Sequence, residues 1–155
     1  LSIGGLFVLY QNLNESKKQI AILSLANSSY ANQVNYMNEA IKVYGNTDYQ
    51  KVVLKGTDNS PSSQMVVAFN AKEQKVMVDM KNMSMPETDD AHDYQLWALV
   101  DGKPVDLGIF NTSDQDIALK NMKSLENAQA FAVTLEPKGG SVSPTLEKMM
   151  VMGAI

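Results

Sequence analysis

The chain has 155 residues, of which 45% are hydrophobic and 19% are charged, and its formal net charge at pH 7 is −4. This composition is typical of a chain with one ordinary folded domain and a hydrophobic core. The cations are all Lys and lie scattered, and Cys is absent, which excludes clustered phosphate contacts to nucleic acid, disulfides, thiolate metal sites and cysteine nucleophiles.

The first ten residues, LSIGGLFVLY, contain no charged side chain. They are too few to cross a bilayer, which takes ~20 residues, and they lack the basic leader of a signal peptide. We expect residues 1–10 to be the outer end of a transmembrane helix. The alternative is an apolar helix start that packs on the domain.

A long helix is predicted from Leu6 to Tyr44, because this stretch has no Pro or internal Gly and its apolar residues recur every three or four positions. Gly45-Asn46 is a plausible C-terminal cap, so residues 11–45 are expected to form a helix or coiled-coil stalk. The apolar stripe predicts either a homodimer, whose register a polar core residue would fix, or packing of the helix on its own domain. The predicted dimer seam contains Ile20, Leu23, Asn27, Tyr30, Val34, Met37 and Ile41.

Short apolar runs alternate with turn residues over residues 46–155, which predicts a mainly β domain of about seven strands. A β-sandwich-like fold is expected, with a small barrel as the alternative. Residues 113–124 are the exception and predict one or two amphipathic helical turns. The predicted strands are Lys51–Lys55, Gln64–Asn70, Lys75–Asp79, Asp93–Val100, Val105–Phe110, Ala128–Leu135 and Met149–Gly153.

The stretch YQLWALVDGKPVDLGIF, residues 94–110, contains the only tryptophan, Trp97. Both faces of its first strand are largely apolar, which predicts a central strand covered on both sides. Asp101-Gly102 predicts a two-residue hairpin turn with positive φ at both positions. Whether Trp97 also touches a ligand is left open by this pattern.

Candidate metal ligands are few. The single histidine, His92, follows a carboxylate-rich loop that lacks calcium-loop spacing, so a polar loop is the simpler interpretation. The clustered Met77, Met80, Met83 and Met85 suggest soft Cu(I) ligands, but strand alternation places Met77 on the opposite face from Met80. Core packing is therefore favoured, and Met80, Met83, Met85 and His92 form only a weak copper hypothesis.

Three segments together resemble a known family. They are YQLWALVDGKPVDLGIF, FAVTLEPKGGSVSPT (residues 131–145) and the apolar strand MMVMGAI, and they are similar to the C-terminal domain of the anti-sigma-K factor family. The similarity is clearest from Lys51 to Ile155. The residues that carry it, expected to be structural, are Tyr94, Leu96, Trp97, Gly102, Pro104, Gly108, Phe110, Phe131, Thr134, Glu136, Pro137, Gly139, Gly140, Ser141, Pro144 and Thr145.

The resemblance implies a single-pass protein of the bacterial inner membrane whose β domain lies in the periplasm or otherwise outside the cytoplasmic membrane. A cytoplasmic segment, absent from this chain, would bind an extracytoplasmic-function sigma factor, and an envelope protease would release that factor by regulated proteolysis. No enzymatic activity, cofactor or nucleic-acid partner is expected. The alternatives are a copper-responsive envelope domain and a structural stalk-and-head interaction protein.

Overall fold

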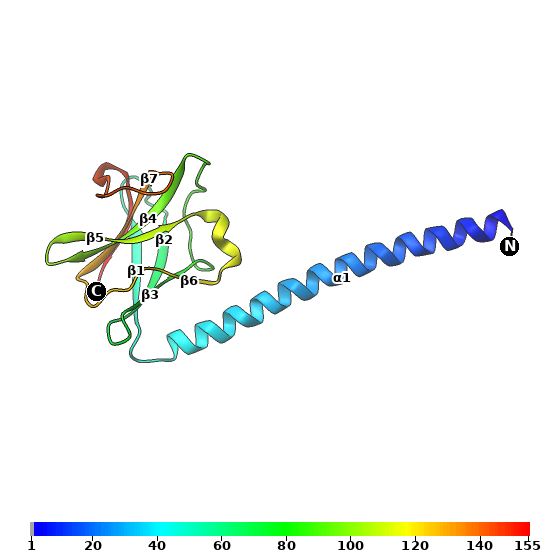
Figure 1. The fold of residues 1–155 in the computed structure, drawn as a ribbon, viewed down its shortest axis with the longest axis horizontal. Coiled ribbons are helices and arrows are strands. Elements are labelled where there is room, and N and C mark those ends of the chain that lie inside the picture. Colours follow the sequence, from blue (N-terminus) through cyan, green and yellow to red (C-terminus); the bar gives the residue numbers. More distant parts are fainter. Residues whose placement is uncertain (1) are drawn as a thin grey trace. The chain divides into compact units, whose positions relative to one another are not determined.

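A computed structural model describes residues 2–155, apart from the side chains of residues 115 and 116. The chain forms one long helix followed by eight antiparallel strands (Figure 1). The predicted fold class, mainly β with a preceding long helix, is confirmed. Leu1, the first residue of the predicted membrane-proximal segment, lies outside the described residues.

The helix α1 runs from Ile3 to Tyr44, so it begins three residues before the predicted start and ends where predicted. Gly45 follows its last residue, and the N–H of Gly45 donates to the carbonyl of Ile41 at 2.9 Å. A Cβ at position 45 would lie 2.6 Å from that same oxygen, which explains why glycine stands there. Among the described residues, no helix is both long and apolar enough to cross a membrane.

The last turn of α1 is part of the β domain. The chain divides into two compact units, and the second, Glu39–Ile155, includes this turn together with the sheet. Val43 is buried against Ala68 and Leu119. The Tyr44 hydroxyl donates to Oδ2 of the buried Asp79 at 2.6 Å. One apolar contact and one hydrogen bond therefore hold the final helical turn against the sheet.

The sheet has the strand order β5-β4-β7-β8-β1-β2-β3-β6, and every pairing is antiparallel. Each predicted strand is present, with bounds that differ by at most two residues at either end. The strands are β1 Gln50–Gly56, β2 Gln64–Asn70, β3 Lys75–Asp79, β4 His92–Val100, β5 Lys103–Phe110, β6 Leu119–Asn121, β7 Ala130–Pro137 and β8 Met149–Ala154.

The sheet curls into a single barrel-like layer rather than two stacked sheets. The segment after β6 connects its two sides, because Met122 N donates to Val76 O of β3 and Lys123 N donates to Leu107 O of β5, both at 2.9 Å. The concave side encloses the main hydrophobic core, to which all strands except β6 contribute. Antiparallel curling of this kind hides one face of every strand without a second sheet.

The segment predicted as one or two amphipathic helical turns, residues 113–124, is different in the structure. A short 3-10 helix, η1, covers Thr112–Asp116, and β6 follows it. The edge of β3 offers unpaired backbone groups, and β6 satisfies them by pairing Leu119 with Asp79. Leu119 is buried, while Lys120 and Asn121 remain more accessible. A single buried apolar residue is also compatible with a helical pattern, which explains the difference from the prediction.

Candidate functional site

Strand β4 lies between β5 and β7 and is buried on both faces, as predicted for a central strand. Its even-numbered side chains Tyr94, Leu96 and Ala98 belong to the main core. The odd-numbered side chains Asp93, Gln95 and Trp97 point to the other face, where the loop after β7 lies over them. Trp97 is on this outer face and is only 3% exposed. The second covering layer is therefore a loop and not another sheet.

The Trp97 indole begins a short chain of buried hydrogen bonds. Its Nε1–H donates to Thr134 Oγ1 of β7 at 2.9 Å, and the Thr134 hydroxyl donates to Glu136 Oε1 at 2.5 Å. Thr134 and Glu136 are both fully buried. Each polar group in the chain thus has a partner, as buried polar groups require.

The same Glu136 carboxylate holds the loop that follows β7. Ser141 Oγ donates to Oε2 at 2.7 Å. Thr145 contributes two hydrogen bonds, one from its backbone N–H to Oε1 at 2.7 Å and one from its hydroxyl to Oε2 at 2.8 Å. A single buried side chain therefore fixes both the middle and the end of residues 138–145.

Two side chains of β4 hold the first half of this loop. Gly139 N donates to Asp93 Oδ2 at 2.9 Å, and Ser141 N donates to Gln95 Oε1 at 2.7 Å. Lys138 adds an ion pair to Asp93 at 3.0 Å. Backbone amides of the loop are thus bound by oxygens of three buried side chains, which fixes the path of the loop over the outer face of β4.

Glycine is required in this loop for two reasons. Gly139 and Gly140 have φ values of 91° and 87°, which side chains other than glycine seldom adopt. In addition, a Cβ at Gly140 would lie 2.9 Å from both Gln95 Oε1 and Ile109 Cγ2. The Gly-Gly pair therefore gives the turn its conformation and lets the backbone approach β4 closely.

The two buried carboxyl groups that hold the loop, Glu136 and Asp93, are held in their charged form. Burial raises the pKa of Glu136, but the hydrogen bonds from Thr134, Thr145 and Ser141 outweigh it, so this pKa lies below its ordinary value. Burial likewise raises the pKa of Asp93, and the Gly139 amide and Lys138 ammonium lower it further than burial raises it. Both groups therefore stabilise the fold when they are ionised.

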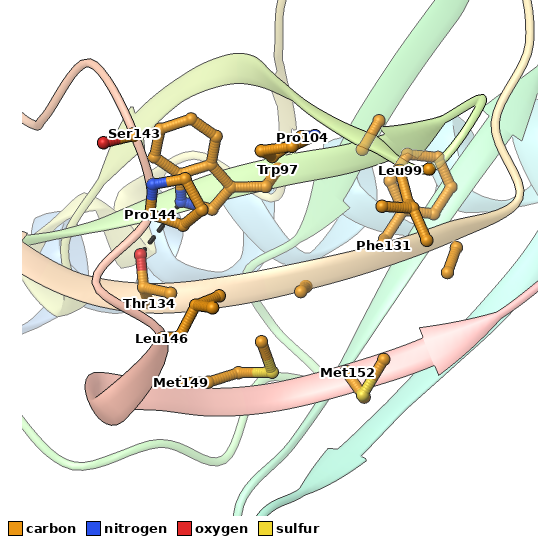
Figure 2. A pocket seen from close by; sticks show the side chains of 14 residues that line it. Trp97, Leu99, Pro104, Phe131, Thr134, Ser143, Pro144, Leu146, Met149 and Met152 are labelled. Carbon is orange, nitrogen blue, oxygen red and sulfur yellow. Dashed lines mark hydrogen bonds between the residues drawn. The ribbon is translucent and has the colours of Figure 1, made fainter.

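An apolar groove of about 460 Å³ lies beside Trp97 on this outer face (Figure 2). Its floor comes from β4 and β7. Its walls come from the start of β5 with Pro104, from the covering loop with Pro144, and from the region around β8 with Leu146, Met149 and Met152. Leu146 and Met152 are 67% and 47% exposed, so the groove presents apolar surface to solvent. Trp97 lines this groove and is also packed in the fold.

The family-motif residues fall into four groups in the structure. Tyr94, Leu96, Phe110 and Phe131 fill the core. Gly102 and Pro104 line the groove, and the hairpin turn has the predicted positive φ at Asp101 and Gly102, 50° and 75°. Gly108, with φ of 108°, lies where the pairing register of β4 and β5 shifts. The group gathered around the covering loop contains Trp97, Thr134, Glu136, Pro137, Gly139, Gly140, Ser141, Pro144 and Thr145.

Sequence reasoning missed two kinds of residue. Asp93 and Gln95 hold the loop, but their partners lie 46 positions away, and only their alternation with Trp97 on β4 indicates the shared face. Met149 and Met152 line the groove, but β8 has the sequence MMVMGA, and a run this apolar does not indicate which residues face outward.

The methionines of the copper hypothesis lie at the main core, and the histidine lies at the start of β4. Met80 is 2% exposed within the core, and Met83 and Met85 pack against that core. Met77 lies with the small cluster around Val43, on the opposite face as predicted. His92 begins β4 and pairs through Nδ1 with Asp89 at 2.7 Å. Among the side chains that the structure describes, no group of three or more His, Asp or Glu could hold a metal ion.

The predicted dimer seam lies entirely on α1, and its side chains are exposed in the single chain. The exposed fractions of its apolar members range from 53% for Met37 to 68% for Leu23 and Tyr30. Dimerisation through this seam stays a prediction.

Thr134→Val tests the hydrogen-bond chain. Valine keeps the shape of threonine but removes the acceptor for Trp97 and one donor to Glu136, so we expect a loss of ~2–4 kcal/mol in the free energy of unfolding. Urea denaturation followed by tryptophan fluorescence measures this loss. Thr47→Val, at an exposed position, is the matched control and should change little. An equal, small effect of both substitutions would contradict a structural role for the chain.

Acid should destabilise the domain through Glu136 and Asp93. Their folded-state pKa values are lowered, so their contribution is complete above their unfolded pKa values of ~4 and is lost as the pH falls through the folded values. The Tm of Glu136→Gln should therefore be lower than that of the unsubstituted protein at neutral pH, and this gap should shrink below pH ~4. Glu87→Gln, at an exposed carboxylate, should track the unsubstituted protein throughout. A gap for Glu136→Gln that is independent of pH would show that the carboxylate is not ionised in the fold.

Comparison with known proteins gives one match. The family model described as "Anti-sigma-K factor rskA, C-terminal" matches residues 4–149, which include nearly all of α1 as well as the β domain. No curated protein sequence and no solved structure gives a significant match. The matched range contains the first two of the three segments from which the resemblance was inferred, and it ends at Met149, the first residue of the third. The chain belongs to the anti-sigma-K factor family as its C-terminal domain, and so to a class of regulatory proteins that interact with sigma factors.

Proposed function

We propose that this chain is the extracytoplasmic regulatory domain of a membrane-bound anti-sigma factor that controls an extracytoplasmic-function sigma factor through regulated proteolysis. The observation that carries the proposal is the family match over residues 4–149. The match spans helix and β domain together, so it supports a role in which the two act as parts of one regulator.

The form of the chain supports a role in relaying a signal. A helix of 42 residues precedes a β domain whose first packed residues, Val43 and Tyr44, belong to the helix itself. Because this last helical turn packs on the sheet, a change in the β domain acts on it directly. In the proposed mechanism, the folded domain protects a cleavage site near the membrane, and a signal shifts the balance toward an exposed state.

A signal can shift that balance only if it binds the protected and exposed states with different affinity. The covering loop is a suitable place for such a difference, because its position depends on a few buried side chains of β4 and β7. The sigma factor would be bound by a segment outside this chain, so no residue among 2–155 is assigned to that contact.

Cysteine labelling in intact cells tests the proposed location. The chain has no cysteine, so Val142→Cys, at a side chain that is fully exposed, introduces a single reactive thiol into it. We expect a membrane-impermeant maleimide to label this variant in intact cells. Val67→Cys, at a side chain with no exposure, is the matched control and should react only after denaturation. Labelling of Val142→Cys only after cell lysis would place the domain in the cytoplasm and refute the proposal.

Deletion of residues 46–155 from the full-length protein in its host tests regulation. We expect sigma-dependent transcription to change, together with the pattern of membrane-proximal cleavage fragments seen by immunoblotting. Replacing residues 46–155 with an unrelated folded domain controls for simple bulk at the cleavage site. Unchanged transcription and unchanged cleavage across growth and stress conditions would instead favour the structural stalk-and-head alternative.

A further inference from the structure

Two concave sites are lined in part by the same covering loop, and they differ in charge. One, of about 370 Å³, contains the Asp106–Lys123 ion pair together with Gln95 and the backbone of residues 139–142. The other is the groove beside Trp97, and none of the described residues that line it carries a charge. Because 19% of the residues in the chain are charged, a site lined entirely by uncharged residues is a distinctive feature. The two sites therefore suit different kinds of molecule.

We propose that the groove beside Trp97 is a binding site for an uncharged, largely apolar small molecule. Its volume of about 460 Å³ lies within the range of small-molecule sites, roughly 300–1,000 Å³. A charged ligand would lose its hydration on entering and would find no opposite charge in the wall, which costs free energy. An uncharged apolar ligand gains from the same burial. The proposal depends on the groove alone and not on the regulatory function.

The polar groups of the groove floor are already occupied. The Trp97 N–H is bound to Thr134, and the Thr134 hydroxyl is bound to Glu136. The floor therefore presents apolar parts of Trp97 and Thr134 beside Ala132 of β7, and its N–H and hydroxyl groups need no hydrogen bond from a ligand. A strongly polar molecule would gain little there, so the ligand class is set by apolar contact.

The groove combines a fixed wall with an adaptable one. Hydrogen bonds from Gly139, Ser141 and Thr145 to buried side chains hold the loop that carries Pro144, so this wall exists before any ligand arrives. The opposite wall is made of Leu146, Met149 and Met152 (Figure 2). Methionine side chains adapt readily to the shape of an apolar partner. A preformed site with a flexible side can therefore fit apolar ligands of somewhat different shape.

The test uses N-phenyl-1-naphthylamine, an uncharged apolar dye whose emission rises in apolar surroundings and which accepts energy from tryptophan. Because Trp97 is the only tryptophan in the chain and lines the groove, energy transfer from it reports that the dye is bound near Trp97, and substitutions in the groove wall then locate it. We expect saturable binding of one dye per chain with quenching of Trp97 emission. Absence of saturable binding by the unsubstituted protein would overturn the proposal.

Met152→Lys and Leu146→Lys each place a charge at an exposed wall position without disturbing a buried group. We expect either substitution to weaken dye binding by about tenfold or more, because the new ammonium must stay hydrated at the mouth of the groove. Val142→Lys is the matched control, since it adds the same charge at an exposed apolar residue of the covering loop that does not line the groove. Its affinity should equal that of the unsubstituted protein.

Two results would overturn the assignment. One is an unchanged affinity in both wall variants, with melting temperatures that show them folded, which would mean that the dye binds elsewhere. The other is a dimer in sedimentation velocity that Met152→Lys dissociates and Val142→Lys does not, which would mean that a second copy covers the groove. Either result leaves the transcription and labelling experiments unaffected, so failure here is distinguishable from failure of the proposed function.

Discussion

The buried carboxylate of Glu136 is the constraint on which the outer face of the β domain depends. A charged group without contact with water is stable only if its lone pairs are satisfied, and here hydroxyl and amide donors from Thr134, Ser141 and Thr145 do so. Those donors come from the strand and from two points of the following loop. The carboxylate therefore has its hydrogen-bond donors only when the loop is in place, and the ionised carboxylate in turn helps to hold the loop there. This mutual dependence makes strand and loop one cooperative unit.

The groove follows from the same constraint. The loop that Glu136 holds carries Pro144 over the outer face of β4, next to Trp97. Trp97 in turn is oriented by Thr134, which also donates to Glu136. The residues by which the family can be identified from sequence are in large part these residues. Their shared task is to shape a surface, which explains why the motif combines glycines, short hydroxyl side chains and one carboxylate rather than a set of reactive groups.

Much of the fold could be predicted because its signals are local. Strands β2 and β3 have the predicted bounds, since apolar runs there end at polar and turn-forming residues such as Asn70 and Asp79. The turn at Asp101-Gly102 was predictable for the same reason. The short strand β6 was not, because its only strong signal is Leu119 and its partner is the edge of β3. The groove was least accessible to prediction. It combines β4, β7, β8 and a loop, and no window of sequence contains them together.

The strand order also determines how the domain can fold. The sheet consists of two groups, β5-β4-β7-β8 and β1-β2-β3-β6, and they meet where β8 pairs with β1. That junction joins Lys55 to Met152 and Gly56 to Val151, residues far apart in the chain. Contacts of such high sequence separation form only after a large loop has closed, and the entropy lost in closing that loop slows folding. If the chain emerges from a ribosome or a translocation channel with its N-terminus first, the edge of β1 that pairs with β8 stays unpaired until β8 has emerged. The domain is thus completed late, and its early strands are the part of the chain most exposed to mispairing during synthesis.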